Sequence, residues 1–334
     1  MAEQRRRVYV FAQPRSTSHL FYQLLSGHPA FQPTRPLTCS FAYQFGGDAQ
    51  ATLSPKAMRD ACGLDDDTIS QASWQNCLDN MQRSALDAES KGKQFLTMDH
   101  PFHLMSSSFV NSHIDVPGHT TCPTPVVVDH KLDVPTNAST LEAEDRELDL
   151  KLHSNPTLIP DRFFFSFTPI ITTRHPAHAI PSAYRAFLNS DIGVDFSHPD
   201  FPVFASYKWT RLVFDSFKSY GAVDAIVVNG EKLVKDPQGQ MKKVCDVLGL
   251  DEGGIRYSWD KPEAWKGSKF EGTFFKTLNE SSGVVPDPKY DKPLDIETEE
   301  EKWMEEWDED TAKVLRKMVE EAMEDYQYLL QYSV

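Results

Sequence analysis

The chain of 334 residues contains 40% hydrophobic and 25% charged residues and carries a formal net charge of −15. This composition supports a sizeable hydrophobic core and excludes global disorder. The negative charge disfavours nucleic acid as a partner, so any site for an anionic ligand must be locally positive. No apolar stretch approaches the roughly 18 residues of a membrane span. The five cysteines form no C-x-x-C pair, which favours a cytoplasmic protein without a disulfide framework or a zinc site.

The first elements predicted along the chain are a strand, a loop and a helix. Residues 8–12 (VYVFA) are short and apolar, which is typical of a buried strand. The polar loop 13–19 follows, and helical periodicity then continues until Gly27. The next expected elements are a segment under the core at 37–44, helices over 54–61 and 68–86, and a strand over 95–98.

Residues 106–157 interrupt this alternation. They are rich in Ser, Thr, Pro, Asp and His and lack sustained periodicity, so we interpret them as an insertion over the active face. A third strand is expected over 170–173 and no earlier, because Pro169 cannot donate within a central ladder. The elements expected after it are helices over 176–188 and 204–220, a strand over 225–228, and helices over 237–248 and 308–332.

Strands that alternate with helices in this way predict one α/β domain. The expected architecture is a three-layer α/β/α fold with a central parallel sheet covered on both faces. We expect a single domain over residues 1–334, with the insertion at about 106–157 and a C-terminal helical tail at about 297–334.

The loop between the first strand and the first helix has the layout of an anion site. Its backbone N–H groups would point into one concavity at the positive end of a helix dipole. Arg15 adds a forked cationic donor, and Ser16, Thr17 and Ser18 add hydroxyl groups. The Walker pattern is absent, which disfavours an ordinary ATPase or GTPase. The alternative is an ordinary capped helix with Arg15 in solvent.

A second basic element follows the third predicted strand. Arg174 leaves the end of that strand, and Ser182 lies eight residues later in the next predicted helix. Ligands gather at the carboxyl ends of parallel strands. An arginine on a strand tip and a hydroxyl on the adjoining helix can therefore converge on one phosphate.

Together these two elements resemble the motifs of sulfotransferases that use 3′-phosphoadenosine 5′-phosphosulfate (PAPS). The first loop of that family typically reads P-[KR]-[ST]-G-[ST]-[ST], and here it is PRSTSH. The second motif reads R-[DHN]-P-x5-S-x-Y or close to it, and here it is RHPAHAIPSAY. Further stretches, among them NPTLIPDRFF and TLNESSGV, are similar to a fungal-type branch of the family associated with secondary metabolism.

The resemblance implies a P-loop sulfotransferase-like fold, PAPS as co-substrate, adenosine 3′,5′-bisphosphate as product and no metal. By the resemblance, one group of residues would cradle the phosphosulfate end: Arg15, Ser16, Thr17, Ser18 and His19. Arg174 and Ser182 would bind the 3′-phosphate, and Ser282 and Gly283 would form part of the nucleotide pocket or simply a turn.

His100 is the candidate base for the acceptor proton. It ends the strand predicted over 95–98, where many sulfotransferases have a similar strand ending in K-x-H. The lysine position of that pattern is Met98 here. A structural strand-end histidine is the alternative, with Asp99 and His103 as other candidates for the base.

The first loop also departs from the family pattern. Thr17 occupies the glycine position, where a side chain would restrict the loop if the position needs a positive φ. His19 replaces a hydroxyl residue, and it is a candidate second catalytic group beside Arg15 or a residue of the pocket wall.

Three functions remain open. The first is sulfuryl transfer from PAPS to a hydroxyl of a small-molecule acceptor. The second retains the fold but performs PAPS-independent acid–base chemistry, such as cyclisation or elimination, with His100 and His19. The third is nonenzymatic binding of the bisphosphate nucleotide. The sequence does not indicate the acceptor or the oligomeric state.

Overall fold

The computed structural model describes residues 7–33, 39–53, 55–134, 141–151, 154–190, 192–261 and 268–334. Its centre is a five-stranded sheet with the order β2-β3-β1-β4-β5, in which every pair of neighbours is parallel. The strands are β1 (Arg7–Ala12), β2 (Phe31–Pro33), β3 (Gln94–Asp99), β4 (Thr168–Thr173) and β5 (Ile226–Asn229). The predicted central parallel sheet is confirmed.

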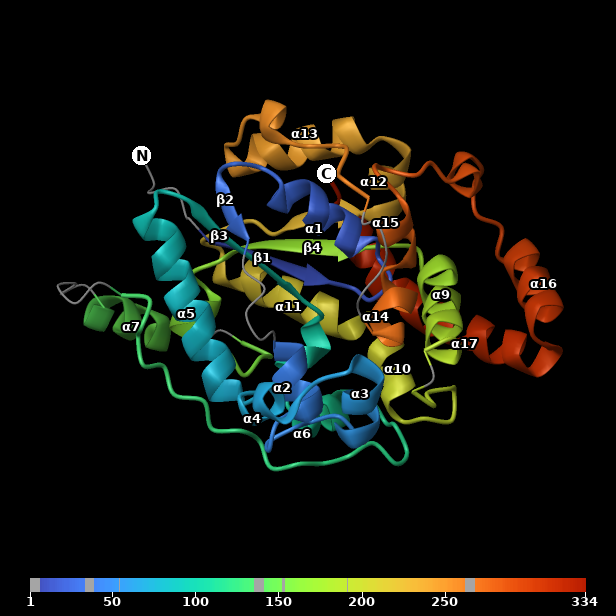
Figure 1. The fold of residues 1–334 in the computed structure, drawn as a ribbon, viewed down its shortest axis with the longest axis horizontal. Coiled ribbons are helices and arrows are strands. Elements are labelled where there is room, and N and C mark those ends of the chain that lie inside the picture. Colours follow the sequence, from blue (N-terminus) through green and yellow to red (C-terminus); the bar gives the residue numbers. More distant parts are fainter. Residues whose placement is uncertain are drawn as a thin grey trace.

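The sheet is covered on both faces, as Figure 1 shows. Along β1, Val8 and Val10 enter a core with residues of α1 (Ser18–Ser26) and α13 (Pro237–Leu248). Tyr9 and Phe11 point the other way, into a core with α5 (Trp74–Ser90) and α11 (Lys208–Tyr220). Because successive strand residues face opposite sides, an almost wholly apolar strand requires a layer of helices on each face.

The remaining helices connect and flank these layers. They are α2 (Cys39–Phe45), α3 (Pro55–Cys62), α4 (Asp66–Ser70), α6 (Ser107–His113), α7 (Leu141–Leu150), α8 (Asp161–Phe164), α9 (Pro176–Leu188), α10 (Asp200–Ala205), α12 (Gly230–Lys235), α14 (Lys269–Phe274), α15 (Lys276–Glu280), α16 (Ile296–Glu306) and α17 (Glu309–Leu330), with the short 3₁₀ helices η1 (Pro101–Leu104), η2 (Glu252–Gly254) and η3 (Pro288–Asp291). No helix in the described ranges is long and apolar enough to cross a membrane.

Three sequence predictions about elements are wrong in detail. β4 begins at Thr168 and includes Pro169, because β5 starts opposite Ile170 and the proline has no neighbour on that side. The helix predicted over 68–86 is two helices, since Ser73 caps a new start by accepting the amide of Asn76. The helix predicted over 204–220 is also divided, by an extended backbone at Ser206.

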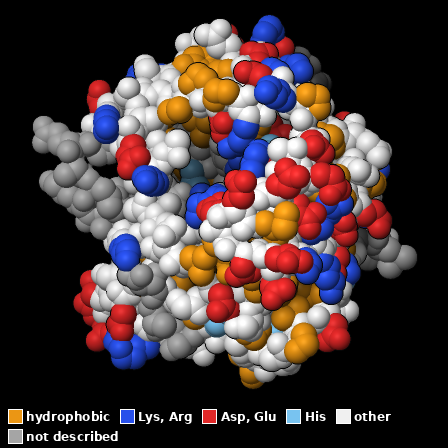
Figure 2. All heavy atoms as spheres, turned by 90° about the vertical axis from the view of Figure 1, so that its right-hand side faces the viewer, with side chains coloured by type: hydrophobic (Ala, Val, Ile, Leu, Met, Phe, Trp, Pro, Cys, Tyr) orange, Lys and Arg blue, Asp and Glu red, His pale blue; other side chains and the backbone are white. Residues whose placement is uncertain are grey.

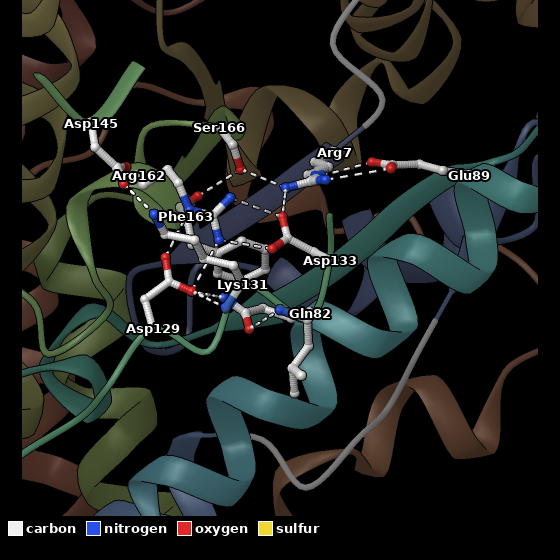
Figure 3. Close-up of polar contacts among 11 residues, drawn as sticks. Arg7, Gln82, Glu89, Asp129, Lys131, Asp133, Asp145, Arg162, Phe163 and Ser166 are labelled. Atoms are coloured by element: carbon white, nitrogen blue, oxygen red, sulfur yellow. Dashed lines mark hydrogen bonds and ion pairs between the residues drawn. The ribbon is translucent and has the colours of Figure 1, made fainter. Parts of the chain in front are cut away.

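Part of the segment at 106–157 lies at the amino ends of the strands, and that the segment also covers the active face stays a prediction. Figure 3 shows Asp129 and Asp133 of this segment bound to Arg162, with Asp133 also bound to Arg7. Arg7 is the first residue of β1, so this part of the segment is fixed at the amino ends of the strands. Buried arginines need carboxylate partners, and the segment supplies them there.

The C-terminal helices pack on the same layer as the second predicted motif. α17 lies against α9, and its buried residues include Leu315, Val319 and Tyr326. The chain then returns to the sheet, where the amide of Val334 donates to the carbonyl oxygen of Val227 at 3.0 Å. The tail therefore covers the β5 edge of the sheet.

Candidate functional site

The loop after β1 has a strained backbone. Arg15 and Thr17 adopt positive φ angles of 60° and 67°, a conformation that costs a residue with a side chain about 1–2 kcal/mol. The loop is tied to β4 by the amide of Gln13, which donates to the carbonyl oxygen of Thr172 at 3.0 Å. Ser16 Oγ lies 2.7 Å from Thr172 Oγ1. Thr17 therefore has the positive φ that restricts a loop residue with a side chain.

Gly230 supports this loop, and the sequence gives no clear signal for it. It begins α12 directly after β5, and a Cβ atom built on it would lie 2.2 Å from the carbonyl oxygen of Ser16 and 2.4 Å from Thr17 Oγ1. Only a glycine permits the loop and the helix to approach so closely. A glycine following a strand is too common in sequences to have identified this contact.

Two arginine side chains meet beside the loop. Arg15 Nε donates to Ser182 Oγ at 3.1 Å, and its Nη1 donates to the carbonyl oxygen of Phe274 at 3.0 Å. Arg174 Nη1 donates to the carbonyl oxygen of Arg15 at 3.1 Å. Burial, together with the charges of Arg174 and Arg185, lowers the pKa of Arg15 to about 10. Arg15 and Arg174 therefore form the locally positive site that an anionic ligand needs in this acidic chain.

Among the residues that the structure describes, neither guanidinium group of this pair has an anionic partner. Within the described ranges, no carboxylate oxygen forms an ion pair with Arg15 or Arg174. Arg174 Nε is buried and has no hydrogen-bond partner. A buried donor of a charged group is costly to leave unpaired, so the arrangement suits an anion with several oxygens.

A pocket of about 300 Å³ opens above the loop. Its walls come from the loop, His100 directly after β3, α9, α10, α12, Trp259 and the segment from Thr273 to Tyr290. The lining residues are Arg15, Thr17, Ser18, His19, Leu20, His100, Arg174, Ser182, Phe204, Val234, Trp259, Thr273, Phe274, Phe275, Lys276, Thr277, Leu278, Ser281, Gly283, Val285, Asp287, Lys289 and Tyr290. In Figure 2, Lys and Arg side chains gather around a hollow, and Asp and Glu side chains crowd the surface beside it.

Most of the residues singled out from the sequence reach this pocket. Ser16 and Ser282 do not line it. The Ser16 hydroxyl faces Thr172 below the loop, and the exposed Ser282 accepts the amide of Trp259 through its carbonyl oxygen at 3.0 Å. In this structure Ser16 and Ser282 thus support the loop and the turn beside the pocket, and their roles in binding a ligand stay predictions.

Trp259 is a pocket residue that sequence reasoning missed. Its indole Nε1 donates to the carbonyl oxygen of Ser281 at 3.0 Å, and its backbone pairs with the same turn. Ser258 and Gly283 form an antiparallel bridge beside it. The Ser281–Gly283 turn therefore fixes a large aromatic ring in the pocket wall, and only the contact between two distant segments reveals this.

His100 stands at the end of β3 with one ring nitrogen fixed. Its Nδ1 lies 2.7 Å from the carbonyl oxygen of Ala12. A carbonyl oxygen only accepts, so Nδ1 carries the proton and Nε2 keeps its lone pair in the neutral ring. Burial, together with the charges of His103 and Arg15, lowers the pKa of His100 to about 3. At neutral pH the imidazole is therefore an uncharged proton acceptor.

The other candidate titratable groups differ in their access to the pocket. His19 lines it and its ring lies 4.3 Å from that of Phe275. Asp99 and His103 are buried and do not line it. Their side chains lie 3.2 Å apart, and Asp99 also accepts the amide of Cys39 at 2.9 Å. Asp99 and His103 thus interact with each other, whereas His19 and His100 line the pocket.

Comparisons with known proteins identify a family for this chain. The chain is similar to "Sulfotransferase ppzF" of Metarhizium majus (23% identity, 97% of this chain and 95% of that protein) and of Metarhizium rileyi (21%, 97% and 94%). Among solved structures it is similar to the sulfotransferase domain from the Synechococcus PCC 7002 olefin synthase, with a TM-score of 0.39, 16% identity, and coverage of 86% of this chain and 88% of that one. A family model described as "Sulfotransferase family" matches residues 7–252. On this match, the chain belongs to the sulfotransferase family.

Proposed function

We propose that this protein is a sulfotransferase that moves a sulfuryl group from PAPS to a hydroxyl of a small-molecule acceptor. The observation that carries the proposal is the pair Arg15 and Arg174 at the carboxyl ends of β1 and β4, two cations that have no carboxylate partner in the described part of the chain. Such a site favours a ligand that carries several anionic oxygens. A nucleotide with phosphates at both ends of its ribose meets that requirement.

The proposed roles follow from the position of each group. The backbone N–H groups of the strained loop and of the first turn of α1 would hold the phosphosulfate end. Arg174 and Ser182 would hold the 3′-phosphate. Arg15 lies between the two ends, since it already bonds Ser182, and it would stabilise the charge that develops on the leaving bisphosphate. His19 is a second group that would stabilise this charge.

His100 is proposed as the base for the acceptor hydroxyl. Its lone pair on Nε2 is available because the carbonyl oxygen of Ala12 fixes the proton on Nδ1. Met98 stands where the family pattern has a lysine, so Arg15 would supply the cationic stabilisation near the transferring group instead. PAPS would supply the transferable sulfuryl group, and the bisphosphate would leave as product.

The two other functions predict different ligand behaviour. PAPS-independent acid–base chemistry on a metabolite needs His100 and His19 but does not need a bisphosphate site. A nonenzymatic binder would hold the bisphosphate nucleotide and would not consume PAPS with any acceptor. The unpartnered donor on Arg174 favours sulfuryl transfer over the first of these, because an uncharged metabolite would leave that donor unpaired.

Calorimetric titration with adenosine 3′,5′-bisphosphate tests the proposal. We expect binding by the wild-type protein and an affinity about 100-fold lower for Arg174→Ala, the factor that corresponds to losing about 3 kcal/mol of charge-assisted hydrogen bonding. Arg83→Ala is the matched control, since Arg83 is an exposed arginine on α5 that bonds Asn80. Absence of binding by the wild-type protein would refute the proposed function.

A further inference from the structure

One carboxylate stands in the wall of the positively charged pocket. Among the described residues that line the pocket, Asp287 is the single acidic one, and it directly precedes η3. Its Oδ1 accepts the amide of Lys289 at 3.2 Å, and its Oδ2 pairs with Lys289 Nζ. Lys289 lines the pocket as well. A pocket that suits an anion therefore contains an acidic side chain, and this side chain engages one of the pocket's own cations.

A tyrosine ring connects this pair to Arg174. The Cζ atom of Arg174 lies 5.7 Å from the ring centroid of Tyr290, and Lys289 Nζ lies 4.9 Å from the same centroid. Both distances are within the range of cation–π attraction. Partial burial opposes ionisation of Asp287, but the hydrogen bond and charge of Lys289 and the charge of Arg174 outweigh it and lower the pKa of this carboxyl. Asp287 is therefore negative at neutral pH and interacts electrostatically with Arg174.

Asp287 would weaken the binding of a phosphate beside Arg174 in two ways. Its negative charge repels the phosphate. It also engages the ammonium group of Lys289, which could otherwise donate to phosphate oxygens. The side chains of Asp287 and Lys289 are 35% and 42% exposed, so solvent screens both effects and together they change affinity by a modest factor.

We propose that Asp287 limits the affinity of the pocket for the 3′-phosphate of the nucleotide, and that Lys289 is a phosphate-binding residue that Asp287 restrains. This inference rests on the proposed function, in which Arg174 binds that phosphate. Both residues lie beyond residue 252, where the match to the family model ends. The repulsion favours dissociation of the bisphosphate product, since affinity differences between variants of one complex arise mostly in the dissociation rate.

Asp287→Asn tests the inference in calorimetric titrations of the full-length protein with adenosine 3′,5′-bisphosphate. Asparagine caps a helix start as well as aspartate does, so the variant retains an acceptor for the Lys289 amide and loses the charge. We expect the affinity for bisphosphate to rise about five-fold, the factor that corresponds to about 1 kcal/mol. The gain should shrink at about 1 M salt, where the screening length is only about 3 Å.

Two matched comparisons identify the source of the gain. Adenosine 5′-monophosphate lacks the 3′-phosphate, and its affinity should change by less than about two-fold in Asp287→Asn because repulsion of the distant 5′-phosphate is screened. Asp291→Asn is the control variant and should bind bisphosphate as the wild-type protein does. Asp291 ends η3, its carboxylate lies 3.8 Å from Lys235 Nζ, and it does not line the pocket.

A second substitution tests the role of Lys289. Lys289→Gln, added to Asp287→Asn, should return the bisphosphate affinity to about the wild-type level. The inference is overturned if Asp287→Asn binds bisphosphate no more tightly than the wild type, if the 5′-monophosphate gains equally, or if the double variant keeps the whole gain. If the wild-type protein does not bind bisphosphate, the proposed function itself fails, and the first titration identifies that case separately.

Discussion

The contact between Gly230 and the loop provides a sharp test of how the site is built. In Gly230→Ala the new methyl carbon would lie 2.2 Å from the carbonyl oxygen of Ser16. That separation must widen to at least 3.0 Å, because real Cβ atoms essentially never come closer. The helix cannot easily withdraw, since the side chain of Asn229 accepts the amides of Glu231 and Lys232 and fixes its start. The loop must therefore move.

The expected cost follows from two opposing terms. Crowding of a packed contact costs about 1–3 kcal/mol, and alanine in place of glycine returns up to about 1 kcal/mol of helix propensity. We expect Gly230→Ala to lower the free energy of unfolding by about 1–2 kcal/mol. A loop displaced on this scale should also weaken bisphosphate binding by about 10- to 100-fold, since misplacement by about 1 Å has effects of that order.

Urea unfolding and calorimetric titration measure these two quantities. Gly47→Ala is the control, because a Cβ atom at Gly47 meets nothing within 4 Å and its φ is not positive. This control should change stability by less than about 0.5 kcal/mol. The reasoning would be refuted by a Gly230→Ala protein as stable as the wild type with the same bisphosphate affinity.

Three further predictions follow from individual residues. Thr17→Gly should raise the free energy of unfolding by about 1 kcal/mol in a urea titration, because glycine adopts the φ of 67° without strain. The acid limb of kcat/KM should lie below about pH 5, because the pKa of His100 in the free protein is about 3, well below the 6.5 of an ordinary histidine, and the base stays unprotonated as the pH falls to that range. Asp133→Asn should cost about 3 kcal/mol of stability and spare bisphosphate affinity, because it leaves Arg7 and Arg162, whose side chains are largely buried, short of a partner at the far end of β1.

A specific result would contradict each of these predictions. A Thr17→Gly protein less stable than the wild type would show that the threonine side chain stabilises the loop. An inflection of kcat/KM near pH 6.5 would show that His100 titrates as an exposed histidine. For Asp133→Asn the control is Asp246→Asn, whose exposed pair with Lys242 should contribute less than about 0.5 kcal/mol. Equal losses in the two variants would contradict the burial argument.

Much of the fold could be predicted from local sequence patterns. The strand over 8–12 and the helix over 237–248 are found almost as expected, since apolar runs and capping residues act within a few positions of the chain. Gly249 ends that helix with a φ of 66°, as its sequence position predicts. The contact of Asp133 with Arg7 could not be predicted, because composition indicates an irregular segment at 106–157 without indicating which end of the sheet each part of it reaches.

For the site, the sequence determined the residue types and the strand ends from which they project. The motifs around Arg15 and Arg174 are local, and parallel strands bring their carboxyl ends to one edge. Tertiary structure alone decided what each side chain does there. It turns Ser16 toward Thr172 and brings Arg15 to the carbonyl oxygen of Phe274, 259 residues away along the chain. Such contacts depend on how whole layers pack, and packing is a property of distant segments that no short stretch of sequence contains.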